Sequence, residues 1–294
     1  MSEAPAFERL LKRDRVITLS GLSALCVLAW IYVVAGAGLG MSAWEMTTLT
    51  LFPHSQGHDL MPGMQGMDMP MDMPGMDMGA SSAAGASWGG VQWALMIAMW
   101  WIMMIAMMTP SAAPAILIYA RVHRHALAGG QVQNKLAPTG AFAAGYLLAW
   151  LGFSAAAAAL HWILEYTGLV SAMMMGSNSR TFSAAVLITA GLYQLSPLKN
   201  VCLSFCRAPA SFLSRHWRPH RLGALRLGAL HGAHCVGCCW MLMVLLFVGG
   251  VMNVIWIAAL AMLVLAEKVL PAGPWVGRVA GIALIAWGAA TLMV

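Results

Sequence analysis

WALMIAMWWIMMIAMM, residues 93–108, contains no charged side chain, and the apolar run around it extends over about residues 91–119. A helix of about 20 residues crosses the hydrocarbon core of a bilayer, which is about 30 Å thick. Backbone amides inside lipid must be hydrogen-bonded within the spanning structure, so we expect a transmembrane helix here. The whole chain is 61% hydrophobic and only 9% charged, whereas soluble domains have about 25% charged residues. The sequence therefore predicts an all-α integral membrane protein.

The apolar runs divide the 294 residues into a polytopic bundle of about seven transmembrane helices. The predicted spans are residues 16–40, 91–119, 139–164, 181–199, 223–249, 251–269 and 275–293. The first run is too long for the apolar part of a signal peptide, so we expect it to be a true span. The predicted parts are a cytoplasmic tail (1–15), a first span (16–40), an external Met-rich loop (41–90) and a six-span metal-binding membrane core (91–294).

The placement of Lys and Arg predicts the orientation of the bundle. Basic residues gather in the N-terminal tail and in the loops 120–138 and 199–222, which alternating spans put on one side of the membrane. No Lys or Arg lies between Arg15 and Arg121. Because basic loops stay in the cytoplasm, the N-terminus is expected inside and the loop 41–90 outside. The net charge of +6 is thus a topology signal, and we expect no nucleic-acid partner.

The predicted external loop contains HDLMPGMQGMDMPMDMPGMDMG at residues 58–79, in which methionines recur at MxM and MxxM spacings. These are Met61, Met64, Met67, Met69, Met71, Met73, Met76 and Met78. Thioether sulfur is a soft ligand that suits Cu(I), and it needs no deprotonation to bind. The interspersed aspartates would attract cations. We expect a Cu(I)-binding loop, and the alternative is a low-complexity linker.

The second predicted span continues the methionine pattern inside the membrane. Helical spacing puts most of its methionines on one face, with two neighbours extending that face sideways. The candidate ligands are Met99, Met103, Met104, Met107 and Met108. The alternative is methionine that faces lipid or fills gaps between helices. Pro110 and Pro114 are expected to bend this helix or to free backbone carbonyls near its end.

The fifth predicted span contains LHGAHCVGCCWMLM at residues 230–243. On a helix, His231, His234, Cys235 and Cys238 follow the spacing i, i+3, i+4 and i+7 and share a face, with Cys239 beside them. His and Cys are ligands for copper, zinc or iron. One straight helix cannot surround an ion, so partners from other helices are needed, and Glu267 is the candidate. The alternatives are ordinary packing for the Cys and His side chains and a structural ion pair for Glu267.

Cys202 and Cys206 lie one helical turn apart near the predicted cytoplasmic boundary. They are either a cytoplasmic exit site for a soft metal or simple interfacial residues, and the sequence leaves both readings open. All six cysteines fall in spans or on the predicted cytoplasmic side, so we expect no disulfide framework.

Three segments share long motifs with a known family. They are MMIAMMTPSAAP (103–114), YQLSPLKNVCLSFCRAP (193–209) and GAHCVGCCWMLM (232–243), which continues through GGVMN (249–253) to Glu267 and Lys268. These segments resemble a bacterial family of predicted metal-binding integral membrane proteins, catalogued as a domain of unknown function. The resemblance covers about residues 91–290 and implies a metal-binding protein of the bacterial inner membrane without an assigned reaction. The loop lies outside it and is similar to Met-rich loops of copper-resistance proteins.

Two main functions fit these motifs. In the first, the loop collects Cu(I), and the Met and Cys/His sites bind it in the bundle for transport, delivery or homeostasis. A periplasmic copper chaperone or a larger membrane complex would then be the partner. No nucleotide-binding motif and no aspartyl-phosphate domain is present, which excludes an ATP-driven pump.

The second function is a membrane-bound copper or iron redox enzyme, or a subunit of such a complex, acting on a lipophilic substrate. His231, His234, Glu267 and the cysteines would hold the metal, and a haem bound through one of the histidines is a weaker variant. A third reading is a structural subunit, since GRVAG at 277–281 is a small-xxx-small packing pattern. Whether the chain is an enzyme stays open, and an oligomer is compatible with the sequence.

Overall fold

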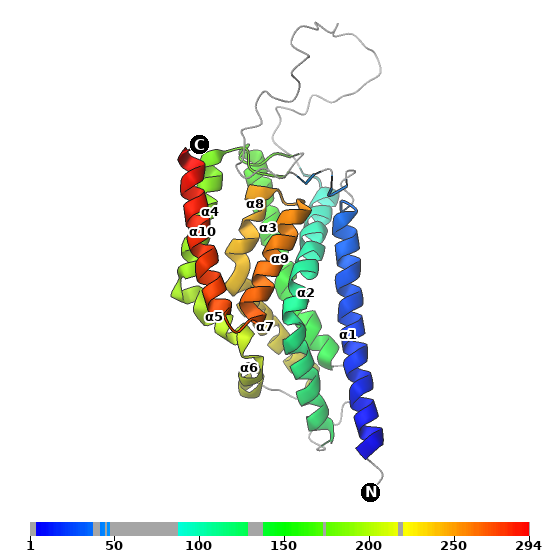
Figure 1. Ribbon diagram of the computed structural model, residues 1–294. Helices are drawn as coiled ribbons and strands as arrows, with labels where there is room; N and C mark the ends of the chain where they lie inside the picture. Colours follow the sequence, from blue (N-terminus) through cyan, green and yellow to red (C-terminus); the bar gives the residue numbers. More distant parts are fainter. Residues whose placement is uncertain are drawn as a thin grey trace, which may run out of the picture.

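The computed structural model describes residues 4–37, 42–44, 46–47, 88–128, 138–172, 175–216 and 220–293, and in these ranges it is helical without a β-strand. The helices are α1 (Ala4–Val34), α2 (Gly90–Ala128), α3 (Pro138–Tyr166), α4 (Arg180–Leu195), α5 (Pro197–Arg207), α6 (Pro209–His216), α7 (Arg221–Val244), α8 (Leu246–Gly249), α9 (Val254–Val269) and α10 (Gly273–Met293). The predicted all-α class is confirmed. The long helices run side by side, with the N-terminus and the C-terminus at opposite ends of the bundle (Figure 1).

Five helical stretches are long and apolar enough to cross a membrane. They are Val16–Val34, Gly90–Ala126, Thr139–Tyr166, Arg221–Gly249 and Gly273–Met293. The pair α4 and α5 makes a sixth if it is counted as one bent span. Helix α9, which corresponds to the predicted span 251–269, has only 16 residues. The structure thus supports a membrane protein with about five such helices, and the number seven stays a prediction.

The predicted span 181–199 is wrong at its end, because the helix stops at Leu195. Pro197 has no backbone N–H and forces an extended conformation on Ser196, whose φ and ψ are −71° and 147°. The Ser196 hydroxyl then accepts a hydrogen bond from the Lys199 amide and begins α5 as its N-cap. The chain bends by 62° at this point, and α5 therefore leaves the direction of α4.

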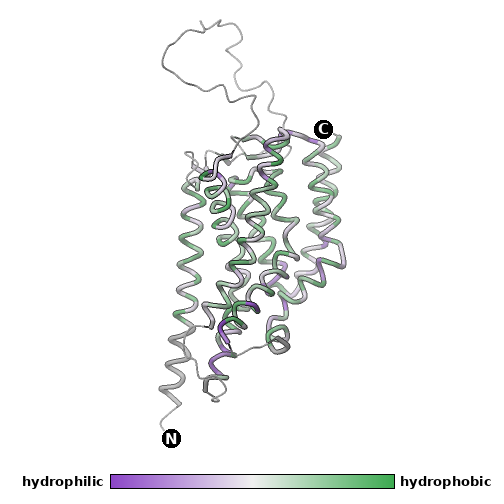
Figure 2. Tube along the Cα trace, turned by 180° about the vertical axis from the view of Figure 1, so that it is seen from behind, coloured by the Kyte–Doolittle hydropathy of each residue, from purple (hydrophilic) through white to green (hydrophobic). Residues whose placement is uncertain are grey.

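The helices form one continuous bundle in which α1 packs on α2, α2 on α3, α3 on α7, and α10 on α4. Helix α9 packs against both α2 and α10, so it connects the two groups. Hydrophobic residues cover most of the helix lengths, and strongly hydrophilic turns collect toward the end that has the N-terminus (Figure 2). This distribution is the one expected of a bundle whose middle part is surrounded by an apolar medium.

The two prolines of α2 leave the helix continuous, and the carbonyl opposite Pro110 accepts a hydrogen bond from another helix. Pro110 cannot donate to the carbonyl of Ala106 four residues earlier. The thiol of Cys26 on α1 donates to that oxygen instead, at 3.6 Å. The packing of α1 on α2 thus satisfies a polar group that the proline left without its helical donor.

Helices α3 and α7 approach each other through glycine. A Cβ atom placed on Gly228 would overlap the carbonyl oxygen of Phe142, and one on Gly145 would overlap the carbonyl oxygen of Leu225. A Cβ on Gly232 would lie 2.7 Å from the Cβ of Ala149. Small residues let membrane helices approach to backbone contact, and here they bring α7 directly against α3.

The GRVAG pattern at 277–281 packs α10 within the chain. A Cβ atom on Gly281 would lie 2.9 Å from the Cβ of Gln194 and 3.0 Å from the carbonyl oxygen of Gly191, both on α4. Gly277 faces the Glu267 side chain, with 3.2 Å between its ideal Cβ position and Oε1. The pattern therefore serves the internal contact of α10 with α4 and α9.

We expect Gly228→Ala to lower stability by about 3 kcal/mol, since the new methyl group would collide with rigid backbone on α3. Gly152→Ala on α3 is the matched control, because its Cβ would meet no atom within 4 Å and alanine favours a helix over glycine. The measurement is the thermal unfolding temperature of both variants in detergent micelles. Equal unfolding temperatures would contradict the close contact of α3 and α7.

Candidate metal-binding site

The methionines of α2 form a buried row along one side of the helix. Their side chains are 0–1% exposed, apart from Met96 at 4%. We call Met96, Met99, Met103, Met104, Met107 and Met108 the methionine row. The row faces the interior of the bundle, so the lipid-facing alternative does not apply. At a rise of 1.5 Å per residue it extends over about 18 Å of helix.

The methionine row ends on the cysteines of α7. The Met108 sulfur lies 3.9 Å from the thiol of Cys239, although the two residues are far apart in sequence. Cys238 and Cys239 donate hydrogen bonds to the carbonyl oxygen of Cys235 at 3.1 Å and 2.9 Å. All three cysteines of α7 are buried. Thioether and thiol sulfurs from two helices are thus in contact inside the bundle.

A fourth cysteine joins this group from α5. The thiol of Cys206 lies near the thiols of Cys235 and Cys238. We call Cys206, Cys235, Cys238, Cys239 and Met108 the sulfur cluster. Cys202 is half-buried, and its sulfur lies 3.0 Å from the ideal Cβ position of Gly237 on α7. The two α5 cysteines, for which an exit site and simple interfacial residues were both open, therefore lie against α7, and Cys206 belongs to the cluster itself.

Two residues beside the sulfur cluster were not foreseen from the sequence. Lys268 on α9 donates to the Cys235 sulfur at 2.8 Å and to the Ser111 hydroxyl at 3.2 Å. The hydroxyl of Tyr146 on α3 lies 3.1 Å from the Cys235 sulfur and donates to the Met108 carbonyl at 3.3 Å. A buried ammonium group requires a counter-charge or strong acceptors. The Lys268 ammonium lies at a place where it can balance a negative charge on the Cys235 sulfur.

Glu267 points away from its neighbour Lys268 and from the cysteines. Its Oε2 forms an ion pair of 2.6 Å with Lys199, and its Oε1 accepts a hydrogen bond of 2.6 Å from Gln194. Gln194 also contacts the Lys199 ammonium. Arg207 donates to the Glu267 backbone carbonyl at 2.8 Å. A structural ion pair is therefore present, but its partner is Lys199 and not Lys268 or an arginine, which were the partners that we weighed. The ligand role of Glu267 stays a prediction.

The two histidines of α7 have different surroundings. His231 is 3% exposed, and its Nδ1 is buried without a hydrogen-bond partner in the described part of the chain. Its ring packs on Phe142, Tyr146 and Phe212, with centroids 6.0, 6.0 and 5.7 Å away. His234 contacts the Leu230 carbonyl through Nδ1 at 2.7 Å. A buried nitrogen without a partner is costly, so His231 is the stronger candidate donor, one turn before Cys235.

Sequence reasoning also missed His161 on α3. It is 1% exposed, and its Nε2 has no hydrogen-bond partner within the described ranges. Trp100 donates to its Nδ1 at 3.5 Å, and Trp88 and Phe247 pack against its ring. The only signal in the sequence was a single histidine in an otherwise apolar helix. Such a histidine is more often a packing residue than a ligand.

The sulfur cluster is held together by hydrogen bonds and not by a formed coordination geometry. Among the residues that the structure describes, no three side chains of His, Cys, Asp or Glu are grouped as a preformed metal site. Asn253 is the N-cap of α9, and its side chain accepts hydrogen bonds from the backbone amides of Ile255 and Trp256. The eight loop methionines, Met61 to Met78, lie outside the described residues.

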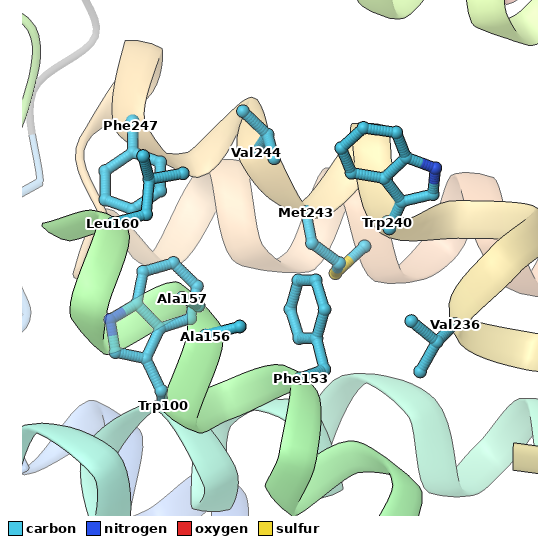
Figure 3. A pocket seen from close by; sticks show the side chains of 10 residues that line it. All are labelled: Trp100, Phe153, Ala156, Ala157, Leu160, Val236, Trp240, Met243, Val244 and Phe247. Atoms are coloured by element: carbon cyan, nitrogen blue, oxygen red, sulfur yellow. The ribbon is translucent and has the colours of Figure 1, made fainter. Parts of the chain in front are cut away.

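A separate apolar pocket of about 310 Å³ opens between α3, α7 and α8. Figure 3 shows its lining, in which the Met243 side chain lies between Phe153 and Trp240. Trp100 of α2 completes the lining on another side. None of the cysteines lines this pocket, so it is distinct from the sulfur cluster.

Residues 97–291 match a protein-family model described as "PpoB2: Copper chaperone". The match covers more than half of the chain and includes the methionine row from Met99 onward and the whole sulfur cluster. It does not extend to the predicted external loop. No curated protein and no solved structure matches the chain.

Replacing the Glu267 carboxylate separates a structural role from a ligand role. We expect Glu267→Ala to lower stability by about 3–5 kcal/mol, because it leaves the Lys199 ammonium buried without its partner. The double variant Lys199→Met/Glu267→Gln should recover much of this loss. The measurements are thermal unfolding and Cu(I) affinity of the folded protein. An affinity loss at unchanged stability in Glu267→Gln would instead make Glu267 a ligand.

Proposed function

This chain belongs to the copper chaperone family, and on that premise we propose that it is a multi-pass membrane protein that binds Cu(I) and delivers it onward. The observation on which this rests is the contact between the Met108 sulfur and the Cys239 thiol, 3.9 Å apart. It joins a row of buried thioethers to a cluster whose three α7 thiols are buried. Soft sulfur donors of these two kinds select Cu(I) over hard cations.

The methionine row supplies the path of the ion in this proposal. Successive thioethers on one helix face lie about one turn, or 5.4 Å, apart. A Cu(I) ion can therefore form a bond to the next sulfur before it leaves the last. Thioethers need no deprotonation, so the transfer requires no proton movement until the thiols are reached. The row is buried, which keeps water away from the ion.

The sulfur cluster is the proposed resting site of the ion. Cu(I) accepts low coordination numbers, so Cys235, Cys239 and Met108 would suffice as ligands, with His231 as a further donor. Binding to two thiolates releases two protons and leaves one net negative charge. Lys268, now 2.8 Å from the Cys235 sulfur, balances that charge inside the bundle. The lysine would give up its contact with sulfur as the ion enters.

We further propose the finer arrangement expected from the sequence. The N-terminus lies in the cytoplasm of a bacterial cell, seven spans cross the inner membrane, and the loop 41–90 collects Cu(I) outside. A periplasmic copper chaperone or a membrane complex would be the donor or acceptor. The distribution of basic residues supports this orientation.

A redox enzyme for a lipophilic substrate is the less favoured function. The apolar pocket in Figure 3 has a suitable lining for a hydrocarbon chain. Among the described residues that line it, Met243 is the one soft donor, and none of the thiols of the sulfur cluster lines it. A substrate bound there would not touch a metal held by the cluster. Copper delivery needs no such contact.

The double variant Cys235→Ala/Cys239→Ala tests the resting site. We expect it to bind at least one Cu(I) equivalent fewer than the natural protein, because two thiolate ligands are lost. Cys26→Ala is the matched control, since the Cys26 thiol donates to the Ala106 carbonyl, outside the cluster. The measurement is anaerobic competition with the chromophoric chelator bicinchoninate. Unchanged copper binding in the double variant would overturn the proposed site.

The double variant Met103→Leu/Met107→Leu tests the path. Leucine replaces methionine in a core at a cost of less than about 1.5 kcal/mol, so the fold should remain. We expect Cu(I) to reach the cluster at least about tenfold more slowly and to the same final extent. The Cu(I)–thiolate absorption, followed after mixing, reports the rate. Met262→Leu is the control, because the Met262 side chain is 64% exposed and lies outside the row, and it should leave the rate unchanged. If Met103→Leu/Met107→Leu takes up Cu(I) as fast as Met262→Leu, the row is not the path.

A further inference from the structure

A cavity of about 640 Å³ lies at the end of the bundle where the Met-rich loop begins and ends. Met46 lines it just before the undescribed segment, and Trp88 lines it just after. Glu165 of α3 is also part of its lining. The loop is therefore attached to the rim of this cavity on both sides.

Three methionines from separate parts of the chain line the cavity. Met46 follows α1, Met96 lies in the second turn of α2, and Met175 lies in the turn between α3 and α4. Their side chains are 4%, 4% and 7% exposed. Three buried thioethers are thus gathered at one cavity, and among the described residues a single carboxylate and no cysteine or histidine line it. This donor set suits a soft monovalent cation better than a hard one.

The backbone at Met175 is held in an unusual conformation. Its φ is +50°, in the left-handed region that long side chains rarely adopt. Two hydrogen bonds fix the residue, from its own amide to the Ser171 carbonyl at 2.8 Å and from the Val251 amide to its carbonyl at 3.1 Å. Strain of this kind persists where the surroundings determine it, and it gathers at ligand sites. Here it keeps a thioether at the cavity.

The cavity and the methionine row share one residue. Met96 belongs to both, and Met99, the next residue of the row, lies on the following turn of α2. His161, with its unpartnered Nε2, lies beyond Trp88, at 5.8 Å between the ring centroids. Glu165 adds a negative charge that concentrates cations at the cavity.

We propose that this cavity is a Cu(I)-binding site at which the loop hands the ion to the bundle, through the thioethers of Met46, Met96 and Met175. The proposal rests on the proposed function. Transfer is ligand exchange at constant oxidation state, in which each new Cu–S bond forms before an old one breaks. No electron and no proton is exchanged, because thioethers are neutral in both states.

The test compares the natural full-length chain with the triple variant Met46→Leu/Met96→Leu/Met175→Leu. Cu(I) itself is the probe, supplied anaerobically and titrated against bicinchoninate in detergent micelles. We expect the variant to bind one Cu(I) equivalent fewer, with the thiolate absorption of the cluster retained at saturation. Met252→Leu is the matched control: Met252 is buried, next to Val251, but does not line the cavity. It should bind as many equivalents as the natural chain.

The outcomes separate this proposal from the proposed function. If the natural chain and the triple variant bind the same number of equivalents, the cavity site is wrong and copper binding stands. If the natural chain binds no Cu(I), both are wrong. Should the triple variant fail to fold, Met46→Leu alone and Glu165→Gln replace it. Each should then weaken binding of one equivalent at least about threefold, and unchanged affinity in both would also overturn the cavity site.

Discussion

The backbone contact between α3 and α7 determines where the candidate metal ligands of this bundle lie. Gly228 and Gly232 leave no room for a side chain against α3, and the sulfur cluster begins one turn later, at Cys235. Tyr146 follows the glycine that α3 contributes, and its hydroxyl reaches Cys235 and the Met108 carbonyl. Close backbone approach therefore sets the depth of the cluster and the reach of the groups around it. A wider helix separation would leave Cys235 with fewer neighbours.

The two adjacent charged residues of α9, Glu267 and Lys268, contact two different groups of residues. Successive residues of a helix point about 100° apart, so Glu267 meets Lys199 and Gln194 while Lys268 meets Cys235. The first group joins α4, α5 and α9 through a satisfied ion pair. The second leaves an ammonium next to thiols. Glu267 thus forms a structural ion pair, and the next residue, Lys268, contacts the sulfur cluster. The ion pair holds in place the helix that positions Lys268.

Hydropathy predicted the all-α class and the positions of the long helices, because apolar length is a local property. The bend at Ser196 could have been anticipated from Pro197, but a continuous apolar pattern obscured it. Helical spacing placed the α7 cysteines on one side. Helical spacing could not show that Cys206 lies near the α7 cysteines, or that the Glu267 side chain pairs with Lys199 and not with the cysteines. Both depend on how α5 and α9 pack in the bundle. No spacing in the sequence connects Lys268 or Tyr146 to the cysteines of α7. The cavity at Met46, Met96 and Met175 likewise joins residues far apart in sequence.

The short length of α9 has a mechanical consequence for the surrounding lipid. Its 16 residues extend over about 24 Å, whereas a typical hydrocarbon core is about 30 Å thick. Its outward side, which includes the exposed Met262, would meet lipid that has to thin to match it. Thinning brings the headgroup region nearer to the end of α9 where Lys268 lies. The bilayer on this flank would then be deformed, and membrane thickness would influence how deeply the sulfur cluster is insulated.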